Sequence, residues 1–212
     1  AAEGDIEFKD GKFTVAGTDK SAAWGDVTLH AYIAHKFTGA QLEPGLKEGA
    51  FYDPTNFTFP AGCHICEVEI DPDTGITQVV RFTAVDDVGR VINPMIVQGQ
   101  LDGGAVQGLG QALYEQVVYD PQSGQLLTGS LMDYAAPRAD ITPVFRNTMD
   151  ESTPCRNNPL GVKGVGELGT IGATPSVVNA VADALARAGK AAVAPTIQMP
   201  LTAVKVWELL GS

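Results

Sequence analysis

The stretch Leu160-Gly-Val-Lys-Gly-Val-Gly-Glu-Leu-Gly-Thr-Ile-Gly172 gathers five glycines around one acidic residue, Glu167. Glycine lets a backbone adopt positive φ or approach a ligand closely. The stretch is not a P-loop, because the Lys-Ser/Thr ending is missing, and its acid would repel a bound phosphate. Two interpretations stay open: a loop that only packs, or a tight, water-poor loop that presents Glu167 as a general base.

Downstream of this stretch, Thr174-Pro175 predicts a helix start, with Thr174 as N-cap and the proline in the first turn. Apolar residues at helical spacing predict its core stripe, and Gly189 fits the C-terminal stop. The stripe comprises Val177, Val178, Val181, Leu185 and Ala188. A short last helix is expected over about 202–210.

Upstream, a helix is expected from Pro94 to about Gln111, although it contains five glycines. Each helical glycine costs about 1 kcal/mol relative to alanine. The pattern therefore predicts a buried helix whose glycine face is closely approached by another segment, with several short turns as the alternative. Ten of the 24 glycines fall in the two segments 99–110 and 161–172.

Hairpins dominate the rest of the chain. Asp10-Gly11 between alternating apolar residues predicts a hairpin over 6–15, and Ser21 is expected to cap a following helix. Turns with proline in second position predict two further hairpins. Their strands are expected at 63–71 with 76–85 and at 114–119 with 125–128, and one more strand at 144–149. The chain is therefore predicted to be α+β, with mostly antiparallel hairpins packed with several helices.

Composition excludes several function classes. Fourteen basic against 25 acidic residues give a net charge of −11, which disfavours nucleic-acid binding and anionic membranes. No apolar run approaches the roughly 18 residues of a membrane span. Three cysteines form no disulfide framework and favour a reducing, cytoplasmic compartment. Cys63 and Cys66 are expected on opposite faces of a strand, so their C-x-x-C spacing predicts no metal site.

A family resemblance rests on the segment Lys163–Gly169. It resembles the signature loop of the molybdenum hydroxylases, the xanthine dehydrogenase and aldehyde oxidase family. Three further segments match the same family in the same order, namely Asp87–Pro94, Gly99–Gly104 and Val106–Leu113. Nearly the whole chain is similar to the C-terminal part of the molybdopterin-binding large subunit, in the branch similar to aerobic carbon monoxide dehydrogenase.

The resemblance implies roles for individual residues. Glu167 matches the catalytic glutamate, the base toward a Mo-bound hydroxyl in the oxidative hydroxylation of an aldehyde, heterocycle or CO-like substrate. Gln100 matches a glutamine that hydrogen-bonds the pterin, and Val165 and Gly166 match backbone positions that line the cofactor. No metal ligand is implied. For Lys163 two partners stay open, the cofactor or a surface carboxylate.

The resemblance also implies cofactors and partners. These are molybdopterin, in its cytosine dinucleotide form, and partner subunits that carry FAD and a 2Fe–2S cluster. Residues 1–212 are expected to form a single C-terminal portion of a molybdopterin-binding domain, and the remaining portion of the large subunit completes the cofactor site. The alternative is a catalytically inert folded fragment or assembly module that binds no cofactor alone. The low charged fraction of 18% predicts extensive apolar contacts with that remaining portion.

Overall fold

The structure is a computed structural model that describes residues 1–33, 35 and 43–211. The chain divides into two compact units, Ala1–Asp53 and Pro54–Ser212. Among the described residues, all buried ones belong to the second unit. The expectation that residues 1–212 form a single portion of a larger domain stays a prediction. Within the described ranges, no helix combines the length and the apolar character needed to cross a membrane.

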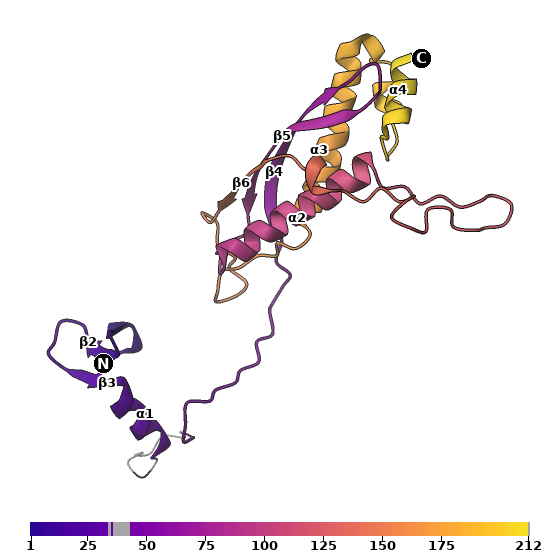
Figure 1. Ribbon diagram of the computed structural model, residues 1–212. Helices are drawn as coiled ribbons and strands as arrows, with labels where there is room; N and C mark the ends of the chain where they lie inside the picture. Colours follow the sequence, from indigo (N-terminus) through magenta and orange to yellow (C-terminus); the bar gives the residue numbers. More distant parts are fainter. Residues whose placement is uncertain (34, 36–42, 212) are drawn as a thin grey trace. The chain divides into compact units, whose positions relative to one another are not determined.

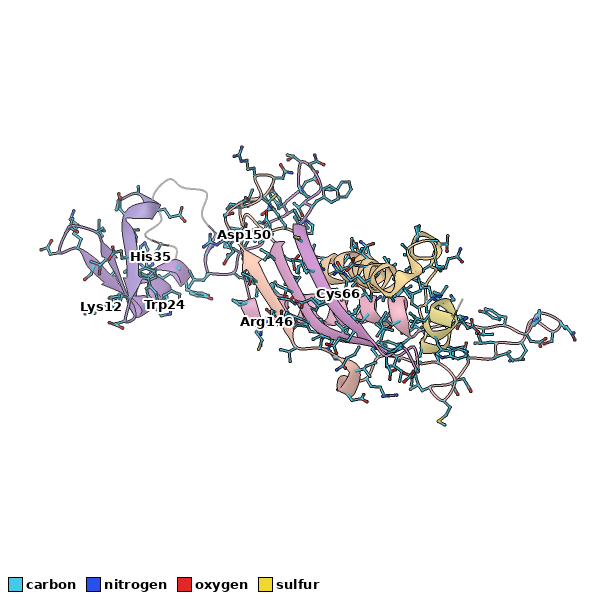
Figure 2. The ribbon with its side chains drawn as sticks, turned by 90° about the horizontal axis from the view of Figure 1, so that it is seen from above. Lys12, Trp24, His35, Cys66, Arg146 and Asp150 are labelled. Carbon is cyan, nitrogen blue, oxygen red and sulfur yellow. The ribbon has the colours of Figure 1, made fainter. Side chains whose placement is uncertain are left out.

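The N-terminal unit holds a three-stranded antiparallel sheet followed by one helix. Its elements are η1 (Glu3–Asp5), β1 (Ile6–Lys9), β2 (Lys12–Val15), β3 (Ser21–Ala23) and α1 (Trp24–Tyr32). The predicted hairpin is confirmed, with positive φ at Asp10 and Gly11 as its tight turn requires. The predicted Ser21 cap is wrong, because Ser21 pairs with Thr14 in the sheet and the helix begins at Trp24. Trp24 stacks on aromatic rings of the sheet yet stays half exposed (Figure 2).

The second unit is built on the sheet β4–β5–β6, formed by Ala61–Ile70, Thr77–Asp87 and Phe145–Asp150. The first two strands form the predicted antiparallel hairpin. The third strand runs parallel to β5, because α2 (Pro94–Leu113) crosses over between them. One face of β5 is buried and the other open, so the fold is α+β with helices on one face of the sheet (Figure 2).

Helices α2 and α3 (Leu168–Leu185) lie side by side, and α3 also packs on β4 (Figure 1). The predicted start of α2 is confirmed, with Pro94 in the first turn and the Asn93 side chain accepting from the Ile96 N–H at 3.1 Å. The core joins both helices, β5 and α4 (Ala203–Gly211) around the fully buried Phe82. Short helical turns complete the unit at Ala139–Ile141, Ala186–Lys190 and Ala194–Thr196.

The prediction that the third helix begins at Thr174 is wrong, since α3 begins at Leu168 and contains Pro175. A proline inside a helix removes one backbone hydrogen bond and favours a boundary, which is why the local signal misled. Close packing of the first two turns against α2 outweighs that cost. Gly189 ends the helix with φ of 85°, as predicted. Ala188, which was predicted to belong to the core stripe, is exposed, so the stripe ends at Leu185.

The strands predicted at 114–119 and 125–128 are also wrong. The turn between them forms, with the Gly124 N–H donating to the Asp120 carbonyl at 2.9 Å. The two sides are joined by an isolated bridge between Tyr119 and Leu126 and by the Val118 N–H, which donates to Thr128 Oγ1 at 3.0 Å, and they form no continuous ladder. A two-stranded ribbon without a third strand or a covering helix is marginal. The segment instead projects as a long loop after α2 (Figure 1).

Candidate active site

Glycines bring the backbones of α2 and α3 into direct contact. A Cβ on Gly169 would lie 2.5 Å from the Leu101 carbonyl oxygen and 2.8 Å from the Ala105 nitrogen. A Cβ on Gly108 would lie 2.7 Å from the Cβ of Ala173. These distances leave no room for a side chain. The predicted close approach on the glycine face of α2 is therefore confirmed.

Threonine hydroxyls of α3 reinforce this contact. Thr170 Oγ1 donates to the Gly104 carbonyl of α2 at 2.9 Å. One turn later, Thr174 Oγ1 lies 3.1 Å from Gln111 Oε1 and 3.2 Å from the Thr170 carbonyl oxygen, and its single O–H is shared between them. The start of α3 is thus fixed to α2 by both packing and hydrogen bonds.

The segment Gly161–Lys163 is the first half of the glycine-rich loop, Gly161–Glu167, and is fastened to the residues that follow β5. Gly89 and Val162 form a bridge, and the Lys163 N–H donates to the Val88 carbonyl at 3.0 Å. A Cβ on Gly89 would collide with the Gly161 carbonyl. The first half of the loop is therefore immobilised by backbone contacts.

An ion pair adds to this attachment. Lys163 Nζ lies 2.6 Å from Asp87 Oδ2, and the two side chains are only 12% and 18% exposed. The Lys163 hydrogen bond, followed by one from the Gly89 N–H, lowers the pKa of the Asp87 carboxyl below its usual value. The structure thus pairs Lys163 with a carboxylate, one of its two predicted partners, and that carboxylate is mostly buried.

The second half of the loop brings the predicted site residues together. Gln100 Oε1 lies 3.8 Å from the position of a Cβ on Gly166. The Val165 side chain packs against the small core cluster around Leu101, and its carbonyl accepts from the Leu168 N–H at 3.3 Å. Glu167 precedes the first residue of α3 and makes no side-chain cap hydrogen bond. Glu167 is exposed, so the expected water-poor surroundings are not supplied by the described residues alone.

Open glycines surround these residues. Gly164 and Gly166 are exposed, and a Cβ on Gly164 would meet no atom within 4 Å. The same holds for Gly99 and Gly103 on α2. A flat ligand can therefore touch bare backbone here. The neighbouring Gln100 amide can donate and accept in one plane. Backbone and amide together fit a pterin-like ring.

Comparisons with known proteins show the family of the chain. The model of the molybdopterin cofactor-binding domain family matches residues 1–143. The carbon monoxide dehydrogenase large chain of Hydrogenophaga pseudoflava is 42% identical over 209 residues, which cover 98% of this chain and 25% of that protein. The chain belongs to the molybdenum hydroxylases. It spans about a quarter of the length of the curated relatives that it matches.

Two further molybdenum hydroxylase relatives support the assignment. The nicotine 6-hydroxylase large subunit of Paenarthrobacter nicotinovorans is 40% identical over 207 residues, covering 97% of this chain and 25% of that one. The crystal structure of quinoline 2-oxidoreductase from Pseudomonas putida 86 matches with a TM-score of 0.85 and 39% identity. The match covers 100% of this chain and 26% of the quinoline 2-oxidoreductase chain. Gln100 lies inside the range matched by the family model, and residues 165–167 lie beyond it.

Two cysteines of this molybdenum hydroxylase portion lie on β4, and the third, Cys155, donates its backbone N–H to the Gly161 carbonyl at 2.9 Å. Cys63 is exposed, whereas Cys66 packs against the core on the other face of β4. Burial, with a smaller contribution from Glu67, raises the pKa of the Cys66 thiol to about 12. In the part of the chain that the structure describes, no three His, Cys, Asp or Glu residues gather as metal ligands.

Sequence reasoning missed a buried pair in this molybdenum hydroxylase portion. His64 Nε2 lies 2.9 Å from Asp86 Oδ1, and the two side chains are 4% and 0% exposed. A signal was available, because Asp86 and Asp87 are adjacent in one strand and alternation sends one of two such acids inward. Asp87 pairs with Lys163, and Asp86 enters the core.

Proposed function

We propose that this chain is the base-bearing part of a molybdenum hydroxylase large subunit and that Glu167 is its general base. The observation that carries the proposal is the meeting of Gln100 on α2 with Gly166 and Glu167 just before α3, beside exposed glycine backbone. Membership in the molybdopterin-binding family supports the same cofactor at this place.

Each residue has a task in this proposal. The Gln100 amide hydrogen-bonds a polar edge of the pterin, while the Val165 and Gly166 backbone lines the cofactor. The Glu167 carboxylate accepts a proton during the reaction, and it can do so because it is not itself a metal ligand. When bound, the molybdenum cofactor supplies the redox chemistry and the Lewis-acid centre.

Two attachments hold the proposed base in place. Before Glu167, the Lys163–Asp87 ion pair fastens the loop to β5. After it, Gly169 and Thr170 fasten the first turn of α3 to α2. A base held on both sides needs little reorganisation when it takes up the proton, and this preorganisation favours catalysis. The remaining portion of the subunit would exclude water from the exposed side.

The proposal extends to the assembly. We assign the remaining portion of the large subunit, an FAD subunit and a 2Fe–2S subunit as partners, and the cytosine dinucleotide form of molybdopterin as cofactor. The relatives are named for carbon monoxide, nicotine and quinoline, which supports a small-molecule substrate of the aldehyde, heterocycle or CO-like kind. A cytoplasmic location is proposed because the cysteines are few and free.

The competing interpretation is an inert module that binds no cofactor. It is disfavoured because the open glycines and Gln100 lie beside Glu167, an arrangement that packing alone does not require. Elemental analysis of the chain alone and together with the remaining subunits distinguishes the two. Molybdenum in the assembled preparation supports the enzyme, and molybdenum in neither preparation supports the inert module.

The decisive test of Glu167 is the Glu167→Gln variant in the assembled enzyme. The amide keeps the size of the side chain and cannot accept the proton, so turnover should fall by about a hundredfold or more. Molybdenum content should stay at the wild-type level. Glu208→Gln, on the exposed side of α4, is the matched control and should turn over normally. Near-normal turnover of Glu167→Gln would refute the proposed role.

A further inference from the structure

The His64–Asp86 pair lies between the sheet and α3. The His64 side chain comes from the middle of β4 and Asp86 from the end of β5. The Nε2–Oδ1 distance is 2.9 Å, and both side chains are withdrawn from solvent. The Phe82 ring meets the imidazole edge-on, with centroids 5.5 Å apart. The imidazole is thus held by Asp86 and by an aromatic ring of the core.

Helix α3 rests directly on this imidazole. A Cβ on Gly172 would collide with His64 Nδ1 and with two carbons of the same ring. One turn later, Ser176 Oγ lies 3.2 Å from the His64 backbone carbonyl oxygen and 2.7 Å from that of Gly172, and its single O–H is shared between them. His64 therefore contacts α3 through both its ring and its backbone.

The Asp86 side of the pair is equally confined. A Cβ on Gly62 would collide with Asp86 Oδ1, so the carboxylate fits only against a glycine. His64 Nδ1 and Asp86 Oδ2 are buried and lack hydrogen-bond partners. Unpaired polar atoms in a core are costly, and an apolar side chain of similar size would avoid that cost. The pair therefore stabilises the folded chain less than apolar side chains of the same size beneath α3 would.

We infer that His64 and Asp86 are positioning residues for Glu167. Gly172 follows Glu167 by five residues, or about 7.5 Å along a helix axis. The rigid imidazole fixes the position of Gly172 and therefore the axial position of α3. The axial position of α3 in turn fixes the position of Glu167, which directly precedes the helix. This inference rests on the proposed function of Glu167, since only a general base needs its carboxylate placed so closely.

The test uses the assembled enzyme and the Gly172→Ala variant, whose methyl group meets the imidazole. Turnover per molybdenum should fall about tenfold or more, with KM and molybdenum content unchanged. Amide hydrogen exchange over 164–171, measured without substrate, should speed up. Adding His64→Gln should restore at least part of both properties, because glutamine can still donate to Asp86 and can yield to the methyl group.

Val181→Ala is the matched control, because Val181 is fully buried on the same helix well beyond Gly172. It should lower the Tm but leave turnover per molybdenum and exchange over 164–171 unchanged. If Gly172→Ala fails to assemble, Asp86→Asn, which keeps the side-chain shape, replaces it with the same expected loss per molybdenum.

Three outcomes overturn the inference. These are normal turnover per molybdenum in Gly172→Ala, a double variant no better than the single one, and a loss in Val181→Ala as large as that in Gly172→Ala. Failure of the proposed function looks different. In that case Glu167→Gln keeps its turnover, while the exchange rates still report whether the imidazole positions the loop.

Discussion

Two sets of glycines on and beside α2 and α3 have opposite surroundings. At Gly108 and Gly169 a side chain would strike the neighbouring helix, whereas at Gly99 and Gly164 it would meet nothing within 4 Å. The first group lies inside the α2–α3 contact, and the second group lies on the surface where those helices begin. The same residue type therefore serves two purposes, close packing of backbone and exposure of backbone.

The difference separates stability from function along one helix pair. The effect of substituting a packed glycine can be measured as a change in the free energy of unfolding of this chain, because the atoms that the new side chain would meet belong to the chain itself. Open glycines confer no packing, and they even destabilise helix α2 by their low helix propensity. The cofactor contact proposed above accounts for their presence near Gln100 and Glu167.

The strongest way to break this comparison is Gly169→Ala. The added methyl group would press on the backbone of Leu101 and Ala105, neither of which can move aside as a flexible side chain could. The free energy of unfolding should fall by about 3 kcal/mol, at the upper end for overpacking. Urea denaturation of the chain measures this loss. A change below about 1 kcal/mol would contradict the assignment of Gly169 to the packed group.

A smaller effect is expected when the fixed half of the loop loses its ion pair. Because the folded-state pKa of Asp87 is lowered, its contribution is present above the unfolded value of about 3.9 and is lost as pH falls through the folded pKa. Asp87→Asn should therefore cost about 1 kcal/mol at pH 7. The difference from wild type should shrink below about pH 4.

Urea denaturation at neutral and acidic pH checks this dependence. Asp140→Asn is the control, since it removes a carboxylate from an exposed pair with Arg138. The control should change stability little at either pH. An Asp87→Asn difference that grows on acidification would have the wrong sign and would show that backbone contacts alone hold the loop.

The smallest effect on stability is expected for Gly166→Ala. Its Cβ would meet only Gln100, at an ordinary contact distance, so the free energy of unfolding should stay within about 0.5 kcal/mol of wild type. In the assembled enzyme the molybdenum content should nevertheless fall, because the methyl group occupies space meant for the ligand. Unchanged stability with unchanged molybdenum content would remove Gly166 from the cofactor contact.

Features with a local signal could be predicted from the sequence. The hairpin over 6–15 and the turn after β4 depend on a few adjacent residues, and the start of α2 depends on Asn93 and Pro94. The start of α3 could not be found in this way, because packing against α2 extends the helix past the boundary that Pro175 suggests. The two strands expected around Tyr119 do not form, because no third strand pairs with them.

The candidate site divides in the same way. The family resemblance predicts Glu167 and Gln100 as site residues, but their proximity depends on two helices that meet only in the fold. The His64–Asp86 pair was missed because its members are 22 residues apart. Only the register of β4 on β5 and the placement of α3 bring them together. Contacts between distant segments carry no signal in neighbouring residues.

The position of α3 in the sequence has a consequence for biosynthesis. The hairpin β4–β5 presents Val79 and Phe82 on its inner face, whereas Val177 and Val181, which cover that face, come about a hundred residues later. At translation rates of about 5–20 residues per second, the apolar face is left uncovered on the ribosome for about 5–20 s. Synthesis of this protein therefore includes an interval in which a chaperone has a defined surface to bind.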